Sequence, residues 1–442
     1  MKKYRGLILI ILTFVITYIF WIPEEQASTM ASNRQYSQLI ASIALVSFAW
    51  INYISSRHKL VDRIFNGLDK SYAYHKYLSI ISILLIWAHK FTLKTGGGGR
   101  PEGFKPVGEG FKRTSEFAGQ SGSSLLHMLT NGKQLGTLSL YTFTGFTIFF
   151  LITYKLEYEK WKILHKLMIV PYAFGVAHYY LSSSYQVFDL SAFSIWMNII
   201  NVIGILSAIY SICIYEFTAF KYRYKVSKIR EIAKDTLEIT GISSGKVMDY
   251  TAGQFAFMKV VGSKKVFPSH PFTMSQSQNN SEIQFGIKVL GDHTGKLKEG
   301  LKVGDTIAVS GPYGRFNYRK AEKRQVWIAG GIGITPFRSF LQSDIPTDYN
   351  IDFFYAYNNE QDAPYVDELK GIKDRNNLRI HLIDSSKSGF LGVEHIDKYV
   401  NRDEQFEVFF CGPKPMRNKM KNELKKENYK VKEFHYEQFQ FK

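Results

Sequence analysis

Four histidines lie inside long apolar runs, where a polar side chain is costly and commonly marks function. His75 and His89 are fourteen positions apart within the run Tyr74–Phe91, and a second pair, His165 and His178, occupies a later apolar run. Fourteen helical residues fall about 40° short of four full turns, so the first two imidazoles face nearly the same way, about 21 Å apart along the axis. Imidazole nitrogens are common metal ligands. The alternative, that each ring is satisfied by its neighbours, is stronger for one histidine than for two pairs.

Six apolar runs in the first half of the chain are expected to span a membrane. In chain order they are Gly6–Ile22, Leu39–Ile54, Tyr74–Phe91, Ser139–Tyr154, Leu164–Leu181 and Phe193–Phe217. Lys and Arg cluster at the amino terminus, between the second and third runs, between the fourth and fifth, and after the sixth. The positive-inside rule therefore places both termini in the cytoplasm and predicts a multi-pass protein of the plasma membrane. The first run also resembles a cleaved signal peptide, although its length favours a retained helix.

The basic residues themselves do not indicate nucleic-acid binding. The formal net charge is +18, but the basic side chains lie largely at the ends of the apolar runs, where they orient a protein in the bilayer. The chain has two cysteines, Cys213 and Cys411, which argues against a disulfide framework or a cysteine metal site. The lipid bilayer is thus the expected partner of the first half of the chain.

The two histidine-bearing runs are the third and the fifth, so they cross the membrane in the same direction. His75 and His165 therefore lie near the cytoplasmic side, and His89 and His178 lie deeper, toward the outer side. This arrangement predicts two bis-histidine haems, one in each leaflet, suited to electron transfer. His165 and His178 are thirteen apart, which leaves them about 140° out of phase on an ideal helix. Pro171 lies between them and is expected to distort that helix.

The second half of the chain, from Lys221, is typical of two further domains. Short strand-like runs separated by turns predict an antiparallel β-barrel: Tyr224–Ile239, Phe255–Val261, Glu282–Val289 and Thr306–Val309. Later runs alternate with helical patterns and predict an α/β domain with a parallel sheet: Val326–Ala329, Ile351–Tyr357, Arg379–Ile383 and Glu407–Phe410. The expected domains are a helical membrane domain at 1–220, the barrel at 221–320 and the α/β domain at 321–442.

Two groups of residues in the barrel have the chemistry of a flavin nucleotide site. An extended Pro-aromatic-Thr segment offers an aromatic face and hydroxyls to FAD, although an ordinary strand end has the same composition. The residues are His270, Pro271, Phe272, Thr273 and Ser275. A cation, backbone amides and a hydroxyl near an expected helix start suit the pyrophosphate. These are Ile287, Lys288, Thr294 and Gly295. Gly311 belongs to a Gly-Pro-Tyr-Gly sequence expected to close the barrel as a tight turn.

A glycine-rich loop in the α/β domain predicts a nicotinamide dinucleotide site. It follows a strand and precedes a helix, so its backbone would admit a phosphate at the helix N-terminus. Its candidate residues are Gly330, Gly331, Gly333, Thr335 and Pro336. Cys411, Gly412 and Pro413 end the last predicted strand, where ligands bind in doubly wound sheets. Cys411 would lie beside the nicotinamide, or else is a buried strand-end thiol.

Together these residues resemble the NADPH oxidase and ferric reductase superfamily, in particular bacterial single-chain NADPH oxidase homologues. The resemblance covers nearly the whole chain: six spans with paired histidines, then the HPFT segment, GGIGITPF and CGP in the family's order. It pairs His75 with His165 and His89 with His178, and it assigns Phe439, near the carboxyl end, to stacking on the flavin. Packing within the protein is the alternative for this aromatic tail.

The resemblance implies electron flow from cytosolic NAD(P)H through FAD and two haem b groups to an outer acceptor. Dioxygen, giving superoxide, is the expected acceptor, and no obligatory regulatory subunit is expected. The alternatives are a ferric or metal-chelate reductase and a membrane cytochrome that passes electrons to a partner protein. Animal oxidases carry a further histidine where this chain has Leu93. The sequence Asn358-Asn359-Glu360 lacks the arginine expected to hold a 2′-phosphate. The choice between NADPH and NADH therefore stays open, with Lys387 as the other candidate.

Overall fold

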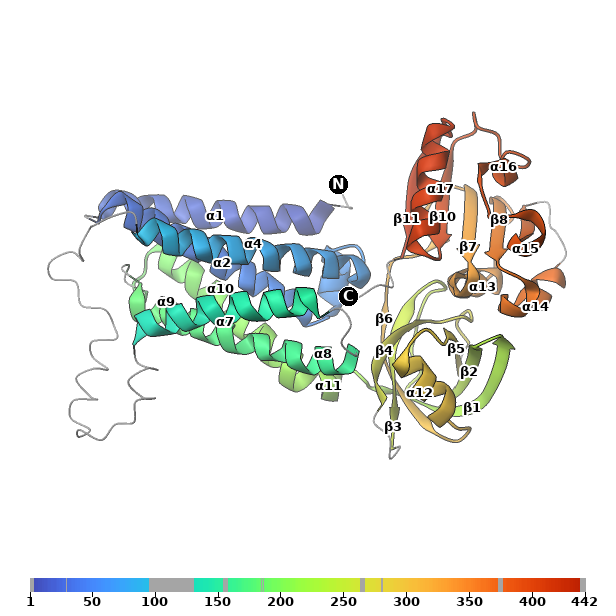
Figure 1. The fold of residues 1–442 in the computed structure, drawn as a ribbon, viewed down its shortest axis with the longest axis horizontal. Helices are drawn as coiled ribbons and strands as arrows, with labels where there is room; N and C mark the ends of the chain where they lie inside the picture. Colours follow the sequence, from blue (N-terminus) through green and yellow to red (C-terminus); the bar gives the residue numbers. More distant parts are fainter. Residues whose placement is uncertain are drawn as a thin grey trace. The chain divides into compact units, whose positions relative to one another are not determined.

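The computed structural model describes residues 4–28, 30–94, 131–153, 158–183, 185, 187–262, 267–279, 281–372 and 377–437. The chain divides into two compact units between Phe217 and Thr218, and Figure 1 shows a helical first unit and a second unit built from two sheets. Phe439 and most of the glycine-rich stretch between the third and fourth predicted spans lie outside the described residues.

The first unit is a helical bundle. Its elements are α1 (Arg5–Ala27), α2 (Ser32–Ser55), α3 (Lys59–Ile64), α4 (Leu68–Lys94), α7 (Gly132–Ile152), α8 (Tyr158–His165), the 3₁₀ turn η2 (Lys166–Met168), α9 (Ile169–Ser182), α10 (Ala192–Ile209), the π-helical turn η3 (Tyr210–Ile214) and α11 (Tyr215–Thr218). The long helices lie side by side, with α2 packed on α4 and α10 and with α7 packed on α9.

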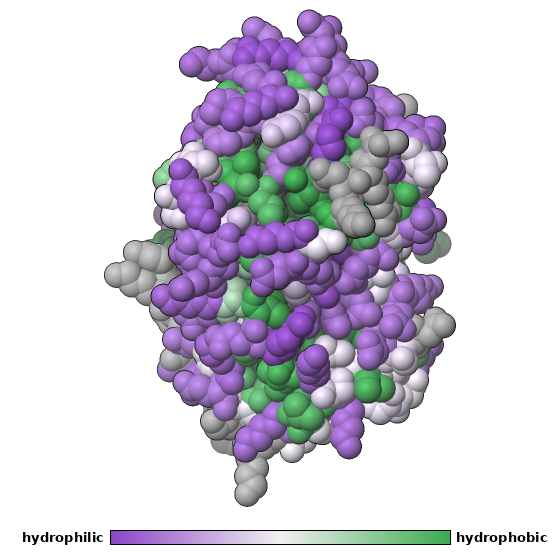
Figure 2. Space-filling model, turned by 90° about the vertical axis from the view of Figure 1, so that its right-hand side faces the viewer, coloured by the Kyte–Doolittle hydropathy of each residue, from purple (hydrophilic) through white to green (hydrophobic). Residues whose placement is uncertain are grey.

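Five described helices are long and apolar enough to cross a membrane: α1, α2, α4, α7, and α10 continued through α11. Large apolar side chains on these helices face outward, such as Leu84 and Ile152, each 66% exposed. Figure 2, which faces the second unit, shows mostly hydrophilic side chains with small hydrophobic groups between them. The outward-facing apolar surface of the helices is what a lipid environment favours.

The fifth predicted span is broken into α8, η2 and α9, so it is distorted as the proline led us to expect. Pro171 lies in the first turn of α9 and has no N–H to donate to the carbonyl of Leu167, four residues earlier. The 3₁₀ turn Lys166–Met168 includes that residue. Ser139 Oγ of α7 donates a hydrogen bond of 2.8 Å to the Pro171 carbonyl.

The second unit begins with the expected antiparallel barrel. Its strands are β1 (Tyr222–Ala233), β2 (Thr236–Ser243), β3 (Phe255–Val261), β4 (Phe267–Thr273), β5 (Glu282–Lys288) and β6 (Thr306–Tyr313). Their order is β4-β3-β6-β1-β2-β5. A bridge between Met274 and Phe285 joins the ends of this order, and helix α12 (Asp292–Gly300) follows β5.

Two local predictions for the barrel are wrong. The run Tyr224–Ile239 is not one strand but the hairpin β1–β2, which turns at Asp235, a residue with φ of 53°. Gly311 does not form a closing turn. It lies inside β6, where the register against β3 shifts between Phe255 and Phe257 and thus marks a β-bulge.

The α/β half of the second unit is a five-stranded parallel sheet of order β11-β10-β7-β8-β9. The elements are η4 (Tyr318–Lys320), β7 (Arg324–Gly330), η5 (Gly331–Ile334), α13 (Thr335–Leu341), β8 (Asn350–Tyr357), η6 (Glu360–Asp362), α14 (Val366–Lys370), β9 (Leu378–Asp384), α15 (Ser385–Ser388), α16 (Val393–Ile396), β10 (Phe406–Cys411), α17 (Lys414–Lys426) and β11 (Val431–Tyr436). Both faces of the sheet are covered: Trp327 and Phe353 belong to one core, and Val326 and Phe354 to another. Burial on both faces explains the continuous apolar runs of these strands.

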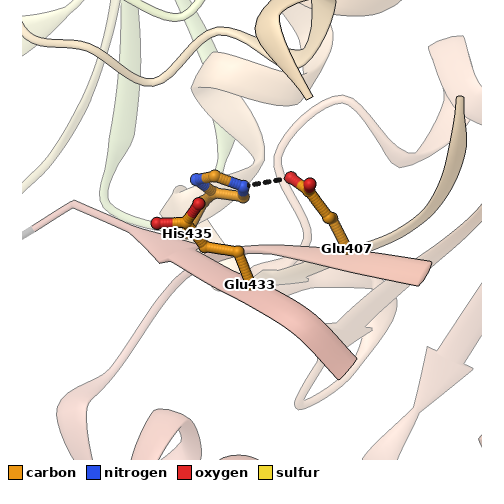
Figure 3. A group of neighbouring side chains, drawn as sticks. All are labelled: Glu407, Glu433 and His435. Atoms are coloured by element: carbon orange, nitrogen blue, oxygen red, sulfur yellow. Dashed lines mark hydrogen bonds and ion pairs between the residues drawn. The ribbon is translucent and has the colours of Figure 1, made fainter. Parts of the chain in front are cut away.

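Strand β11 was not predicted, because its sequence carries charges. It pairs with β10, and His435 Nε2 lies 2.6 Å from Glu407 Oε2 across the two strands, with Glu433 beside them (Figure 3). The His435 ring also stacks on Phe409. The donor atoms of Glu407, Glu433 and His435 lie within 4.8 Å of one another, which is compatible with a metal ligand set. Because His435 and Glu407 already bind each other, we interpret the group as an anchor for β11.

Candidate redox sites

The four histidines form two facing pairs in the helical unit. His75 of α4 faces His165 at the end of α8, with ring centroids 6.0 Å apart and an interplanar angle of 56°. His89 of α4 faces His178 of α9 at 6.1 Å and 65°. A metal bound about 2 Å from one nitrogen of each ring needs ring centres roughly 6 Å apart. Each pair is therefore spaced to hold one metal centre between its imidazoles.

Three of these rings are oriented by backbone carbonyls. The Nδ1 atoms of His75, His89 and His178 lie 3.3, 2.8 and 2.7 Å from the carbonyl oxygens of Ile51, Ser37 and Gly132, respectively. A carbonyl only accepts, so Nδ1 carries the proton and Nε2 keeps its lone pair. This hydrogen bond is the usual support of a metal-binding imidazole. Sequence reasoning missed the three carbonyl partners, since backbone contacts leave no residue-type signal.

Close packing of α7 against α9 brings His178 to its place. A Cβ on Gly136 would lie 2.7 Å from the His178 ring, so only glycine permits this approach. The 3₁₀ turn η2 also brings His165 and His178 closer to the same side of their span. Each of its three residues rotates by about 120° instead of 100°, which reduces the angle between the two side chains around the helix axis from about 140° to about 80°.

His165 is supported differently from the other three rings. Its Nδ1 has no hydrogen-bond partner in the part of the chain that the structure describes. Instead, the ring stacks on Trp161 at 4.6 Å and 11°, and Phe150 meets it edge-on at 4.7 Å. Aromatic packing thus fixes the plane of the ring that ends α8.

The predicted flavin residues of β4 are brought to the first turn of α12. His270 of β4 stacks on His293 of α12, with ring centroids 3.4 Å apart. Thr273 and Ser275 are buried, and Phe272 packs beside the barrel core. Pro271 pairs with Phe257 in the ladder between β4 and β3. The segment 270–275 and the start of α12, which the sequence predicted as two parts of one flavin site, are therefore neighbours.

The start of α12 is an open helix N-terminus. Thr294 Oγ1 accepts hydrogen bonds from the amides of Leu290 (3.0 Å) and Gly291 (3.3 Å), which caps the helix with its own first turn. A Cβ on Gly291 or Gly295 would meet nothing within 4 Å, so the backbone there is accessible. Such an end suits a phosphate. Lys288, at the end of β5, is half-buried.

Two predicted flavin residues, Ile287 and Gly311, serve the packing of the barrel. The side chain of Ile287 belongs to the barrel core, so its contribution to a ligand is limited to its backbone. A Cβ on Gly311 would lie 3.2 Å from the Ala256 Cβ atom on β3, so this glycine serves the packing of the bulge.

The glycines of the nicotinamide loop have different tasks. A Cβ on Gly333 would lie 2.2 Å from the Cys411 carbonyl oxygen, and one on Gly330 would lie 2.9 Å from Cδ of Pro413. These two glycines therefore let the loop pack on the Cys-Gly-Pro turn, where a Cβ on Gly412 would also lie 3.0 Å from the Gly330 amide nitrogen. Gly331, with φ of 53° and no neighbour within 4 Å of its Cβ position, is the accessible one.

Cys411 lies at the end of β10 and is buried. Burial, with the nearby Glu437 carboxylate, raises the pKa of its thiol well above the ordinary value. The sulfur is therefore neutral at physiological pH and adds no charge beside a ligand. Thr335 and Pro336 begin α13 directly after the loop, and Thr335 Oγ1 donates to the Ile332 carbonyl at 3.2 Å.

Sequence reasoning missed Arg338, which lies one turn into α13 and contacts both the barrel and the α/β half. The available signal was an arginine within the apolar segment Thr335–Leu341. The other predicted cation, Lys387, is exposed and forms ion pairs with Glu360 (3.5 Å) and Asp384 (3.4 Å).

Comparison with known proteins identifies both domains of the second unit. Residues 221–317 match the FAD-binding domain family, and residues 327–422 match the oxidoreductase NAD-binding domain family. The second unit therefore contains a segment that matches an FAD-binding domain and a segment that matches an oxidoreductase NAD-binding domain.

The similar curated proteins align with this half of the chain. The anthranilate 1,2-dioxygenase electron transfer component of Acinetobacter baylyi is 29% identical over 42% of this chain and 58% of its own. The propane 2-monooxygenase reductase component of Mycolicibacterium smegmatis is 32% identical over 43% of this chain and 58% of its own. The chain thus spans less than two thirds of these relatives. Among solved structures, the FAD/NAD-binding domain of nitric oxide dioxygenase from Vibrio cholerae aligns with 49% of this chain and 97% of its own, at 19% identity and a TM-score of 0.43.

Proposed function

We propose that this protein is a membrane oxidoreductase that carries electrons from cytosolic NAD(P)H across the bilayer to an acceptor on the outer side. Dioxygen, reduced to superoxide, is the acceptor that we propose. The observation that carries the proposal is the presence, in one chain, of two facing histidine pairs in an apolar helical unit and of FAD- and NAD-binding domains. The basic segments at the ends of the apolar runs support a plasma-membrane location with both termini and the second unit in the cytoplasm.

The histidine pairs fit two b-type haems. His75 with His165 would hold the inner group, and His89 with His178 the outer one. The ring separations would allow each pair to hold one iron, and in His75, His89 and His178 the carbonyl bonds to Nδ1 would leave Nε2 free to bind it. A bis-histidine haem supplies a low-spin carrier of single electrons. The residues of this chain hold the imidazoles in fixed orientations, which favours fast electron transfer.

The second unit fits FAD and a nicotinamide nucleotide. FAD would supply the chemistry that links two-electron hydride transfer to one-electron transfer. Segment 270–275 and the start of α12 would hold FAD, and the loop at Gly331 would hold the nucleotide phosphate.

The experiment that tests the proposal follows the haem spectrum anaerobically. NADPH or NADH is added to the purified full chain with FAD, and oxygen is admitted after reduction. We expect reduced b-type haem that reoxidises with oxygen, with cytochrome c reduction that superoxide dismutase suppresses. Ferric chelates that outcompete oxygen would instead identify a metal reductase.

Substitution of one outer ligand tests the haem assignment. His89→Leu should remove one of two haems and leave flavin reduction by NAD(P)H intact. His58→Leu is the matched control, because His58 only caps α3 by accepting from the Leu60 amide. Both haems should persist in the control, and their persistence in His89→Leu would overturn the assignment.

A second candidate acceptor is a partner protein. The similar proteins named as electron transfer and reductase components of oxygenases favour it. Reduced haem that neither oxygen nor ferric chelates reoxidise would support this alternative.

A further inference from the structure

The barrel and the α/β half of the second unit meet at a buried arginine. Arg338 follows Thr335 by three residues in α13, so both side chains lie on the same face of that short helix. Figure 1 shows α13 and α14 on the barrel side of the parallel sheet. Arg338 is only 6% exposed. A buried guanidinium is strongly unfavourable unless it is paired and hydrogen-bonded, so its partners define what it does.

The partners on the barrel come from strands β2 and β5 and from the segment that follows β4. Arg338 Nη1 donates to the Ser275 carbonyl oxygen at 3.0 Å and to Gln284 Oε1 at 2.9 Å. The same nitrogen lies 3.5 Å from Glu238 Oε2, a buried carboxylate that Arg230 also pairs. These contacts hold the end of the flavin segment of β4, the middle of β5 and the neighbouring strand β2.

The partners in the α/β half come from the other side of the guanidinium. Its Nε donates to Glu368 Oε2 on α14 at 2.8 Å. The Tyr365 ring lies 4.3 Å below the guanidinium carbon, and Tyr365 Oη donates to Ser275 Oγ at 3.4 Å. Arg338 therefore connects α13, to which it belongs, with Tyr365 and Glu368 at α14 and with the flavin segment of the barrel.

The same region contains the close approach of β5 to the nicotinamide loop. A Cβ on Gly286 would lie 2.8 Å from Thr335 Cγ2 and 3.0 Å from Tyr365 Oη. The distance between β5 and the nicotinamide loop is thus set by tight van der Waals contacts. Arg338 adds hydrogen bonds in the same region, and these also fix direction.

We propose that Arg338 is a positioning residue for hydride transfer. It fixes the separation between the flavin segment at Thr273–Ser275 and the nicotinamide loop at Gly330–Pro336, and with it the distance over which the hydride moves. A displacement of 1 Å in a reacting pair costs roughly 100-fold in rate. The planar fork serves several acceptors at fixed angles, which a lysine ammonium does not reproduce. This inference rests on the FAD- and NAD-binding domains and is independent of the haems and the final acceptor.

The test is single-turnover flavin reduction by NAD(P)H in the full chain under anaerobic conditions. Arg338→Met keeps the approximate volume of the side chain and removes its charge and donors. We expect hydride transfer to slow about tenfold or more, with a larger primary isotope effect from C4-deuterated nucleotide. The dissociation constant of the nucleotide and the FAD content should change by less than about threefold. Arg338→Lys should fall between the wild type and Arg338→Met.

Arg324→Met is the matched control for general destabilisation. Arg324 is similarly buried and pairs with Asp352 (2.7 Å) and Glu404 (2.8 Å), but all three lie within the α/β half. Its loss should lower the unfolding temperature without changing the hydride-transfer rate. Gln284→Leu removes one neutral partner of Arg338 and provides a second, milder variant with an intermediate rate. An Arg338→Met or Gln284→Leu protein that binds FAD and transfers hydride at the wild-type rate would overturn the proposal, as would equal slowing in Arg324→Met.

Discussion

Gly333 shows how a missing side chain determines the nicotinamide end of the second unit. Its Cβ position lies 2.2 Å from the Cys411 carbonyl oxygen and 2.5 Å from the carbonyl carbon. Both are backbone atoms, so no rotamer change relieves the overlap. Gly333→Ala must therefore move the loop away from the Cys-Gly-Pro turn.

We predict that Gly333→Ala slows NAD(P)H-dependent flavin reduction at least tenfold, since displaced reactants lose their aligned geometry. We also expect about 2 kcal/mol of destabilisation from the overlap. Stopped-flow absorbance and thermal unfolding measure the two effects. Gly245→Ala is the control, because a Cβ there meets nothing within 4 Å. Equal rates in the two variants would contradict the prediction.

Residue types alone indicated the location of this site but not the reason for its glycines. The sequence predicted that Gly330 and Gly333 admit a phosphate, whereas the structure shows them packed on Pro413 and Cys411. The distinction depends on which segments meet in the fold. Only Gly331 has the open surroundings expected for all three.

Strand β8 carries an ionic centre inside the parallel sheet. Asp352 is fully buried and accepts from Arg324 of β7 at 2.7 Å, from Arg379 of β9 at 2.6 and 2.7 Å, and from His381 Nε2 at 2.9 Å. Burial alone would raise the pKa of Asp352, but hydrogen bonds from His381, Arg379 and Arg324 hold this pKa below its ordinary value of 3.8. The ionised carboxylate thus ties three adjacent strands together.

We predict that Asp352→Asn lowers the free energy of unfolding by about 3 kcal/mol, because it leaves buried cations without their anion. A depressed pKa means that the stabilisation by Asp352 is complete above pH 3.8 and is lost as the pH falls below it. The variant should therefore lose part of the acid sensitivity of the wild type. Denaturant unfolding between about pH 7 and 3 measures both effects. Asp367→Asn, at a side chain that is 93% exposed, should change stability by less than about 0.5 kcal/mol. An unchanged acid dependence in Asp352→Asn would refute this role.

Elements with a clear apolar pattern were predictable, and those fixed by tertiary contacts were not. The run Phe255–Val261 coincides with β3, and four later runs fall within β7, β8, β9 and β10. The hairpin β1–β2 was missed because Lys234-Asp235 carries no glycine or proline at the turn. Strand β11 was missed because pairing with β10, rather than apolar periodicity, defines it. The helix break at Lys166–Met168 was signalled by Pro171, which disturbs the turn before it, although its exact position was not predicted.

At the scale of the whole molecule, the sequence was informative where the polarity of a side chain does not match its expected surroundings. Histidines are costly in apolar runs that lie in lipid, and the structure brings those four histidines into two facing pairs. Arg338 gave a weaker signal, since one arginine in the apolar segment Thr335–Leu341 is ordinary until its burial between the barrel and the α/β half is known. The order of residues along the chain does not show which distant segments contact one another in the fold.

The division between Phe217 and Thr218 leads to a prediction for the second unit alone. Its barrel core and both faces of its sheet are filled by its own side chains. A fragment covering residues 218–442 should therefore fold, bind FAD and reduce ferricyanide with NAD(P)H, because the flavin and nicotinamide residues all lie within it. It should contain no haem, since His75, His89, His165 and His178 belong to the other unit. Flavin fluorescence, haem absorbance and ferricyanide reduction measure these properties. The same fragment with Gly333→Ala should keep FAD but lose most ferricyanide reduction, and a soluble, folded fragment that fails to bind FAD would contradict the assignment of the site.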